Sequence, residues 1–106
     1  MAARKDLGQV YRVILERLDQ SDPERSYVAR LAAQGQDAML KKIAEECCEV
    51  LLAAKNGQRG AATCELADLQ FHLLVWMASA GITPEDVERE LGARFGRSGL
   101  TARGAR

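Results

Sequence analysis

Two neighbouring segments of this chain place acids among strong helix formers: KKIAEECCEV at residues 41–50 and ELAD at residues 65–68. Their acids form two pairs with a spacing of three positions, Glu46 with Glu49 and Glu65 with Asp68. In a helix, side chains three positions apart project from the same side. Each segment therefore predicts a helix that presents a pair of carboxylates on one face.

A Gly-rich break at residues 57–60 separates the two predicted helices. A connection this short indicates that they pack antiparallel as a hairpin. Glu49 lies eight positions before Gly57, and Asp68 lies eight positions after Gly60. These two acids should therefore lie at nearly one level, with the other two within about one helical turn at ~1.5 Å per residue.

Four converging carboxylates repel one another, which raises their pKa values and makes the site costly without a cation. Ligation by oxygen alone suits Mg²⁺ or Mn²⁺, which also bridge to substrate phosphates. The residues after Asp68 are apolar almost all round, which is typical of a buried helix and favours an inward-facing site. For the acids of residues 45–49, the alternative is a solvated helix face beside Lys41 and Lys42.

The composition predicts one all-α domain, because the chain has 106 residues and is rich in Ala, Leu, Glu and Arg. Apolar periodicity predicts five helices, at about residues 7–20, 26–34, 38–56, 61–80 and 84–95. We expect an antiparallel helical bundle built on a central hairpin of the third and fourth helices. Residues 1–95 would form this domain, and the Arg-rich residues 96–106 a flexible tail.

Several residues mark the expected helix ends and packing faces. Asp37 is expected to cap the third helix and Gly81 to end the fourth, while Thr83 and Asp86 match a capping box. The apolar seam of the third helix is expected to contain Leu40, Ile43, Cys47, Val50 and Ala54.

The charge balance gives no support to two classes of partner. The chain has 15 basic and 15 acidic residues, whereas nucleic-acid or membrane-surface binding favours an excess of cations. The longest apolar run, residues 73–82, is too short to span a bilayer, and no secretory signal is recognisable, so we expect a cytoplasmic protein. The three cysteines (Cys47, Cys48 and Cys64) lack zinc-site spacing and are expected as small core residues in a reducing compartment.

The acid pattern, Glu-Glu-x-x-Glu and then Glu-x-x-Asp, resembles the all-α nucleoside triphosphate pyrophosphohydrolases of the MazG-like superfamily. Residues 42–43 and 72–75 make the chain look more closely like the phosphoribosyl-ATP pyrophosphohydrolase family of histidine biosynthesis. The resemblance covers about residues 7–95. It implies magnesium-dependent hydrolysis of phosphoribosyl-ATP to phosphoribosyl-AMP and pyrophosphate, by a homodimer of helical hairpins.

The resemblance also implies roles for individual residues. The metal ligands would be Glu46, Glu49, Glu65 and Asp68. Glu45 would orient or deprotonate the attacking water, and Lys42 would contact the phosphates. Lys41, Lys55 and Arg59 are further candidates to offset the triphosphate charge, with a solvated surface cation as the alternative for each. Phe71 departs from the family, which usually has Tyr at this position.

For three residues the sequence leaves two interpretations open. His72 follows Asp68 by one turn and either orients that carboxylate or is a hydrogen-bonded core histidine. Tyr27 and Trp76 either flank the adenine or pack in the core. Two rival functions also stay open: a house-cleaning pyrophosphohydrolase of another nucleoside triphosphate, and a non-catalytic helical dimerisation module.

Overall fold

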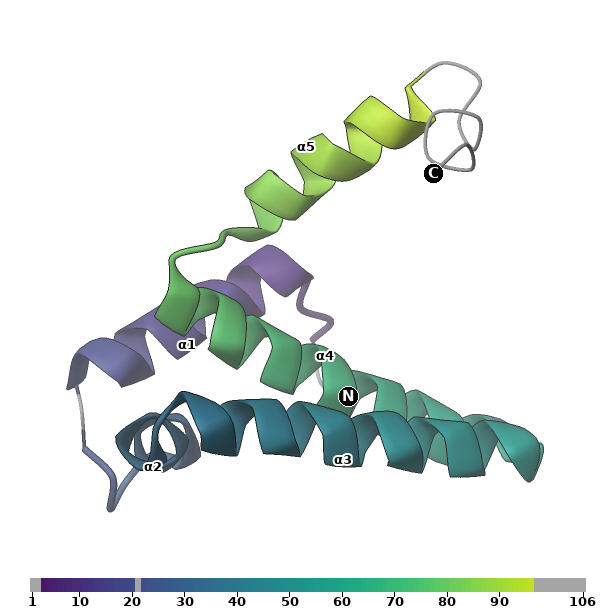
Figure 1. Ribbon diagram of the computed structural model, residues 1–106, viewed down its shortest axis with the longest axis horizontal. Helices are drawn as coiled ribbons and strands as arrows, with labels where there is room; N and C mark the ends of the chain where they lie inside the picture. The colour runs from purple at the N-terminus through teal and green to yellow at the C-terminus, as the bar shows by residue number, and fades with distance from the viewer. Residues whose placement is uncertain (1–2, 21, 97–106) are drawn as a thin grey trace.

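The computed structural model describes residues 3–20 and 22–96. This part of the chain forms five α-helices and no strand (Figure 1). The helices are α1 (Leu7–Gln20), α2 (Tyr27–Gln34), α3 (Gln36–Lys55), α4 (Arg59–Ala80) and α5 (Pro84–Phe95). The all-α fold is therefore confirmed. The predicted Arg-rich tail lies almost wholly outside the described residues.

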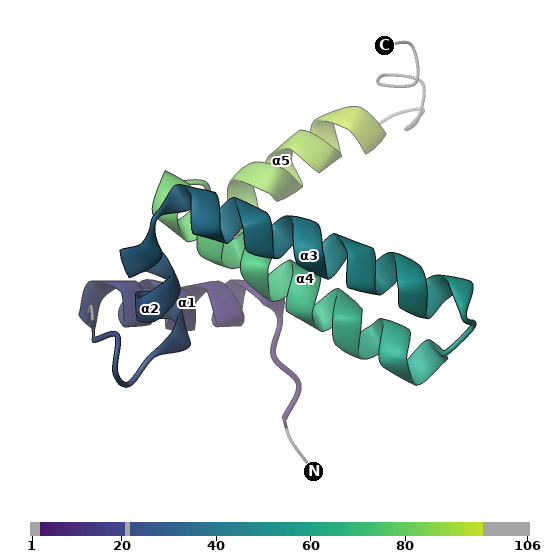
Figure 2. The ribbon, with the colours of Figure 1, turned by 60° about the horizontal axis from the view of Figure 1, so that its bottom comes forward.

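The two longest helices, α3 and α4, pack side by side along their length as an antiparallel hairpin (Figure 2). Gly57 in their connection has φ 68°, a left-handed conformation that glycine adopts without steric cost. α1 and α2 pack at the end of the hairpin away from this connection, and α5 extends from the bundle beyond the end of α4 (Figures 1 and 2).

The hydrophobic core lies where α1 and α2 meet the hairpin. Its buried members are Tyr11, Ile14, Val28, Leu31, Met39, Leu74 and Val75. Val75 and Ile14 are fully enclosed, and burial of a side chain of this size contributes about 1.5–3 kcal/mol. The core thus holds one end of the hairpin, and in the part of the chain that the structure describes the half nearer the connection is formed by α3 and α4.

Two long-range hydrogen bonds fix the C-terminal end of α4. The Tyr11 hydroxyl donates to the carbonyl of Ile82 at 2.9 Å, which ties α1 to the α4–α5 connection. Nε1 of Trp76 donates to Oε1 of Gln36 at 3.2 Å, which ties the last turns of α4 to the start of α3. Trp76 is partly buried against the core, in agreement with the packing interpretation.

The helix ends confirm some predicted caps and correct others. Gly81 ends α4 with φ 75°, and Thr83 and Asp86 form both hydrogen bonds of a capping box on α5. The cap predicted at Asp37 is wrong. Gly35 is the residue between α2 and α3 and adjoins both, so α3 begins at Gln36 and Asp37 lies inside its first turn. α4 also begins earlier than expected, at Arg59, so Gly60 is helical.

The packing face of α3 differs from the predicted seam. Leu40, Cys47 and Ala54 are exposed, whereas Met39 and Ala53 are buried, with Ile43, Glu46 and Val50 half-buried between them. At about 100° per residue, the observed face is rotated by about 60° from the predicted one. The prediction failed because it assigned to the interior the side of the helix that carries Leu40 and Cys47, and the interior face instead contains Glu46.

Two related expectations also fail. All three cysteines are exposed, so they do not fill the core of this protomer. α4 is not buried on every side, because Leu66 is 42% and Leu73 is 38% exposed. The same cause explains both results: each helix of the hairpin has an apolar side that no other described part of this chain covers.

Candidate metal centre and its surroundings

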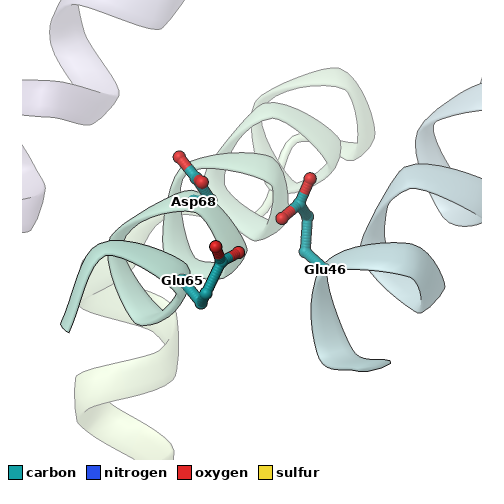
Figure 3. Close-up of side chains that lie close together, drawn as sticks. All are labelled: Glu46, Glu65 and Asp68. Carbon is teal, nitrogen blue, oxygen red and sulfur yellow. The ribbon is translucent and has the colours of Figure 1, made fainter. Parts of the chain in front are cut away.

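Three carboxylates meet between α3 and α4. Glu46 extends from α3 toward α4, and Glu65 and Asp68 lie on neighbouring turns of α4 (Figure 3). Each residue offers one oxygen, and these oxygens lie within 4.8 Å of one another. An arrangement of three hard oxygen donors from two rigid helices can hold a divalent cation.

The electrostatics of this cluster favour a cation. Partial burial and the negative charges of Asp68, Glu49 and Glu46 all raise the pKa of Glu65. A carboxylate whose neighbours are also anionic is stabilised when a positive ion enters, because the ion replaces repulsion by attraction. The residues present therefore fit a metal site on their charge as well as on their geometry.

Glu49 lies beside the cluster without joining it. Its charge acts on Glu65, yet its side chain is exposed and supplies no oxygen to the group within 4.8 Å. Three positions along a helix turn a side chain by about 300°, which leaves the two side chains about 60° apart around the helix axis. Glu49 therefore faces the edge of the hairpin while Glu46 faces α4. The structure thus brings together three of the four predicted ligands.

Lys42 connects the cluster to its surroundings. Its ammonium lies 3.4 Å from Oε1 of Glu46 and 3.8 Å from Oε1 of Glu45. Burial of Lys42 lowers its pKa, but the neighbouring Tyr27, Glu46 and Glu45 outweigh this effect and raise the pKa overall. Lys42 therefore stays charged beside the acids. Glu45 is exposed and points its carboxylate to the same ammonium.

The other predicted cations lie at different distances from the cluster. Lys41 is exposed and lines a surface hollow together with Lys42 and Glu45. Lys55 is in the last turn of α3, nine residues and about 13 Å along the helix from Glu46. Arg59 begins α4 and lines a separate hollow at the hairpin connection. Of the predicted cations, Lys42 is therefore the one that the structure shows in contact with an acid of the cluster.

His72 is buried, and both of its ring nitrogens are hydrogen-bonded. Nδ1 lies 2.7 Å from the backbone carbonyl of Asp68, and Nε2 lies 2.8 Å from the Tyr27 hydroxyl. The contact with Asp68 thus involves its main chain, where the sequence interpretation considered its carboxylate. The Tyr27 partner was missed, because residues 27 and 72 are far apart in the sequence and no pattern links them.

Comparison with known proteins covers nearly all of the described helices. A family model described as Phosphoribosyl-ATP pyrophosphohydrolase matches residues 7–95, a span that includes all three clustered carboxylates. The chain belongs to the phosphoribosyl-ATP pyrophosphohydrolase family.

Curated relatives within this family are similar to this chain over most of its length. The chain is 50% identical over 93 residues to phosphoribosyl-ATP pyrophosphatase of Methylococcus capsulatus, which covers 88% of this chain and 89% of the relative. It is 51% identical over 94 residues to the protein of the same name from Pelotomaculum thermopropionicum, with 89% and 95% covered. It is also 54% identical to the histidine biosynthesis bifunctional protein HisIE of Deinococcus radiodurans, over 89% of this chain and 43% of that protein.

Proposed function

We propose that this chain hydrolyses phosphoribosyl-ATP to phosphoribosyl-AMP and pyrophosphate, the second step of histidine biosynthesis. The observation that carries the proposal is the meeting of three carboxylates within 4.8 Å between two antiparallel helices, in a member of the phosphoribosyl-ATP pyrophosphohydrolase family. The names of the relatives support the same substrate.

The proposed cofactor is Mg²⁺, with Mn²⁺ as the alternative. Glu46, Glu65 and Asp68 would hold the ion, with Glu49 as the fourth acid beside them, since oxygen donors suit both metals. When bound, such an ion neutralises phosphate charge and lowers the pKa of a coordinated water.

The neighbouring side chains have roles that follow from their charge. Lys42 and Lys41 would attract the phosphates of the substrate, because hydrogen bonds between ammonium groups and phosphate oxygens are charge-assisted. Glu45 would accept a proton from the attacking water, since its carboxylate is exposed and lies next to the cluster. The role of Lys55 stays a prediction.

The proposed assembly is a homodimer, and one surface of the hairpin supports it. Exposed apolar side chains project from both helices: Leu40, Cys47 and Leu51 from α3, and Leu66 and Leu73 from α4. At about 100° per residue, each set lies about a quarter-turn from the α3–α4 contact in the same rotational sense. In an antiparallel pair the two sets therefore form one face of the hairpin, here called the outer face. An apolar face of this kind marks an interaction surface.

Among the described residues, none of the helices is long and apolar enough to span a membrane. A cytoplasmic location, a single domain over residues 1–95 and the absence of a nucleic-acid partner stay predictions from the sequence.

Pyrophosphate release from phosphoribosyl-ATP tests the proposal, measured with Mg²⁺ and again in excess chelator. We expect activity only with the metal. A parallel panel of ordinary nucleoside triphosphates separates this activity from a house-cleaning one. Preferred hydrolysis of one of them would contradict the proposed substrate, and absence of all turnover would favour the dimerisation module.

A further inference from the structure

A small hollow is lined by residues of α2 and α3. It has a volume of about 290 Å³. Pockets that enclose whole ligands typically measure about 300–1,000 Å³, so this hollow suits one part of a nucleotide substrate. Lys42 lines it and also contacts Glu46 of the cluster, so a group in the hollow is next to the proposed metal site.

The wall of the hollow is chemically divided. On the α3 side Lys41 and Lys42 contribute ammonium groups and Glu45 contributes a carboxylate that lies 3.8 Å from the Lys42 ammonium. Tyr27, Leu31 and Gln34 contribute a phenol, an aliphatic side chain and an amide on the α2 side. Phosphate oxygens pair with the ammonium groups, whereas the α2 side suits an uncharged, partly apolar group such as a sugar or a base.

The hydrogen-bonding state of Tyr27 follows from its contact with His72. A backbone carbonyl only accepts, so His72 Nδ1, at 2.7 Å from the Asp68 carbonyl, must donate. Nε2 of the neutral ring is then an acceptor, and the Tyr27 hydroxyl donates to it at 2.8 Å. The only proton of the hydroxyl is therefore engaged, and the Tyr27 oxygen is left as an acceptor.

Tyr27 is also held in place by its ring. The ring stacks on Phe71 with centroids 6.1 Å apart and meets the edge of His72 at 5.6 Å. The guanidinium of Arg30 lies 5.8 Å from the centroid of the same ring. Tyr27 nevertheless lines the hollow and is 38% exposed, so its side chain is within reach of a group bound there.

We propose that this hollow binds the part of the nucleotide substrate that carries hydrogen-bond donors, a sugar hydroxyl or the exocyclic nitrogen of the base, with the Tyr27 oxygen as the acceptor and His72 as its positioning residue. The inference rests on the proposed function, because it concerns recognition of the same substrate. It assigns the α2 side of the site to selectivity and leaves phosphate binding to α3.

Tyr27→Phe tests the contact, and Tyr11→Phe is its matched control. Both changes delete one hydroxyl that donates one hydrogen bond, to His72 at 2.8 Å and to Ile82 at 2.9 Å respectively. Loss of a neutral hydrogen bond predicts that Tyr27→Phe raises KM about three- to tenfold with little change in kcat. Tyr11→Phe should leave KM unchanged, because Tyr11 does not line the hollow.

His72→Phe tests the positioning role, because it keeps an aromatic ring and removes both nitrogens. We expect a KM increase in the wild-type background and no further increase in the Tyr27→Phe background, since His72 acts through the hydroxyl. Equal increases in both backgrounds would overturn the positioning role. If His72→Phe does not fold, the Tyr27→Phe and Tyr11→Phe pair still decides the contact.

Substrate analogues identify the donor. One series lacks single sugar hydroxyls, and another lacks the exocyclic nitrogen of the base. For the analogue that lacks the contacting donor, the wild type and Tyr27→Phe should have the same KM. Active wild-type enzyme with an unchanged KM in Tyr27→Phe would overturn this inference alone. Inactive wild-type enzyme would instead overturn the proposed function, and the inference with it.

Discussion

Lys42 and Glu46 lie one turn apart on α3 and form an ion pair, with 3.4 Å between Nζ and Oε1. Glu46 is the more buried residue of this pair, because only 12% of its side chain is exposed against 35% for Lys42. The pair therefore stands between the carboxylate cluster and the hollow lined by Lys41 and Tyr27. Lys42 lines the hollow and also contacts the cluster through Glu46. Glu46 is therefore the most informative acid to substitute.

Glu46→Gln should lower magnesium-dependent turnover by at least about a hundredfold, because it removes a charged oxygen from the cluster. Asp68→Asn should have a similar effect. Circular dichroism should show unchanged helix content in both variants, since each substitution keeps the shape of the side chain. Glu16→Gln, at an exposed position of α1, is the control and should be fully active. Full activity in Glu46→Gln would contradict the metal assignment.

The cluster should make the metal-free protein less stable as the pH rises. Neighbouring charges and partial burial hold the pKa of Glu65 above its ordinary value of 4.5. A group with a raised folded pKa contributes stability below its ordinary pKa, and this contribution is lost as the pH rises through the folded pKa.

Comparison of Tm for the wild type and Glu65→Gln in chelator, between about pH 4 and 7, measures this effect. The wild type should lose stability relative to the variant over that range, and added Mg²⁺ should raise the Tm of the wild type more. A constant difference in Tm at every pH would contradict the repulsion argument.

Asp86 should show the opposite dependence. Its hydrogen bonds with the Thr83 backbone and side chain and its contact with Arg89 lower the pKa of Asp86 below 3.8. The stability it contributes is therefore present above the ordinary pKa and lost as the pH falls through the folded value. The stability difference between wild type and Asp86→Asn should shrink in acid, as measured by urea unfolding. A difference that grows in acid would rule this out.

Thr83→Ala should destabilise the protein by about 1 kcal/mol, because it removes the N-cap of α5. Urea unfolding measures the change. Activity at a temperature well below Tm should not change, since α5 extends away from the α3–α4 hairpin (Figure 1). A loss of activity without a loss of stability would show that α5 takes part in the site.

Leu51→Glu should prevent dimer formation, because Leu51 lies on the outer face of the hairpin and is 68% exposed. Leu52→Glu is the matched control. Leu52 is 57% exposed but turned by about 100° from Leu51, away from that face. Light scattering after size exclusion should give a monomer for the first variant and a dimer for the second. Equal masses for both variants would count against the outer face as the interface.

Local sequence signals predicted the helices well. Leu7–Gln20 matches α1 at both ends, since an apolar stripe and a proline break define it. The Thr83–Pro84–Asp86 pattern gave the start of α5 correctly, because capping depends on residues within one turn. The start of α3 was wrong, because the backbone conformation of Gly35 is decided by how α2 and α3 pack, and the local pattern at Asp37 does not contain that information.

The site was predictable in part, for a physical reason. Three-residue spacing places Glu65 and Asp68 on one side of α4, and hairpin geometry brings Glu46 to them. Which of Glu46 and Glu49 faces inward depends on the rotation of α3, and the sequence favoured the wrong rotation because α3 has two apolar sides. The link between Tyr27 and His72 depends on where α2 packs, so no spacing in the sequence reveals it.

The rotation of α3 has a consequence for the protein's evolution. Glu46 and Glu65 occupy half-buried positions where apolar residues would strengthen the contact between the two longest helices. Apolar residues there would pack without mutual repulsion, so the hairpin gives up stability for its chemistry. Selection for thermal stability alone would replace these acids first. The resulting proteins would be more stable helical bundles without catalytic activity.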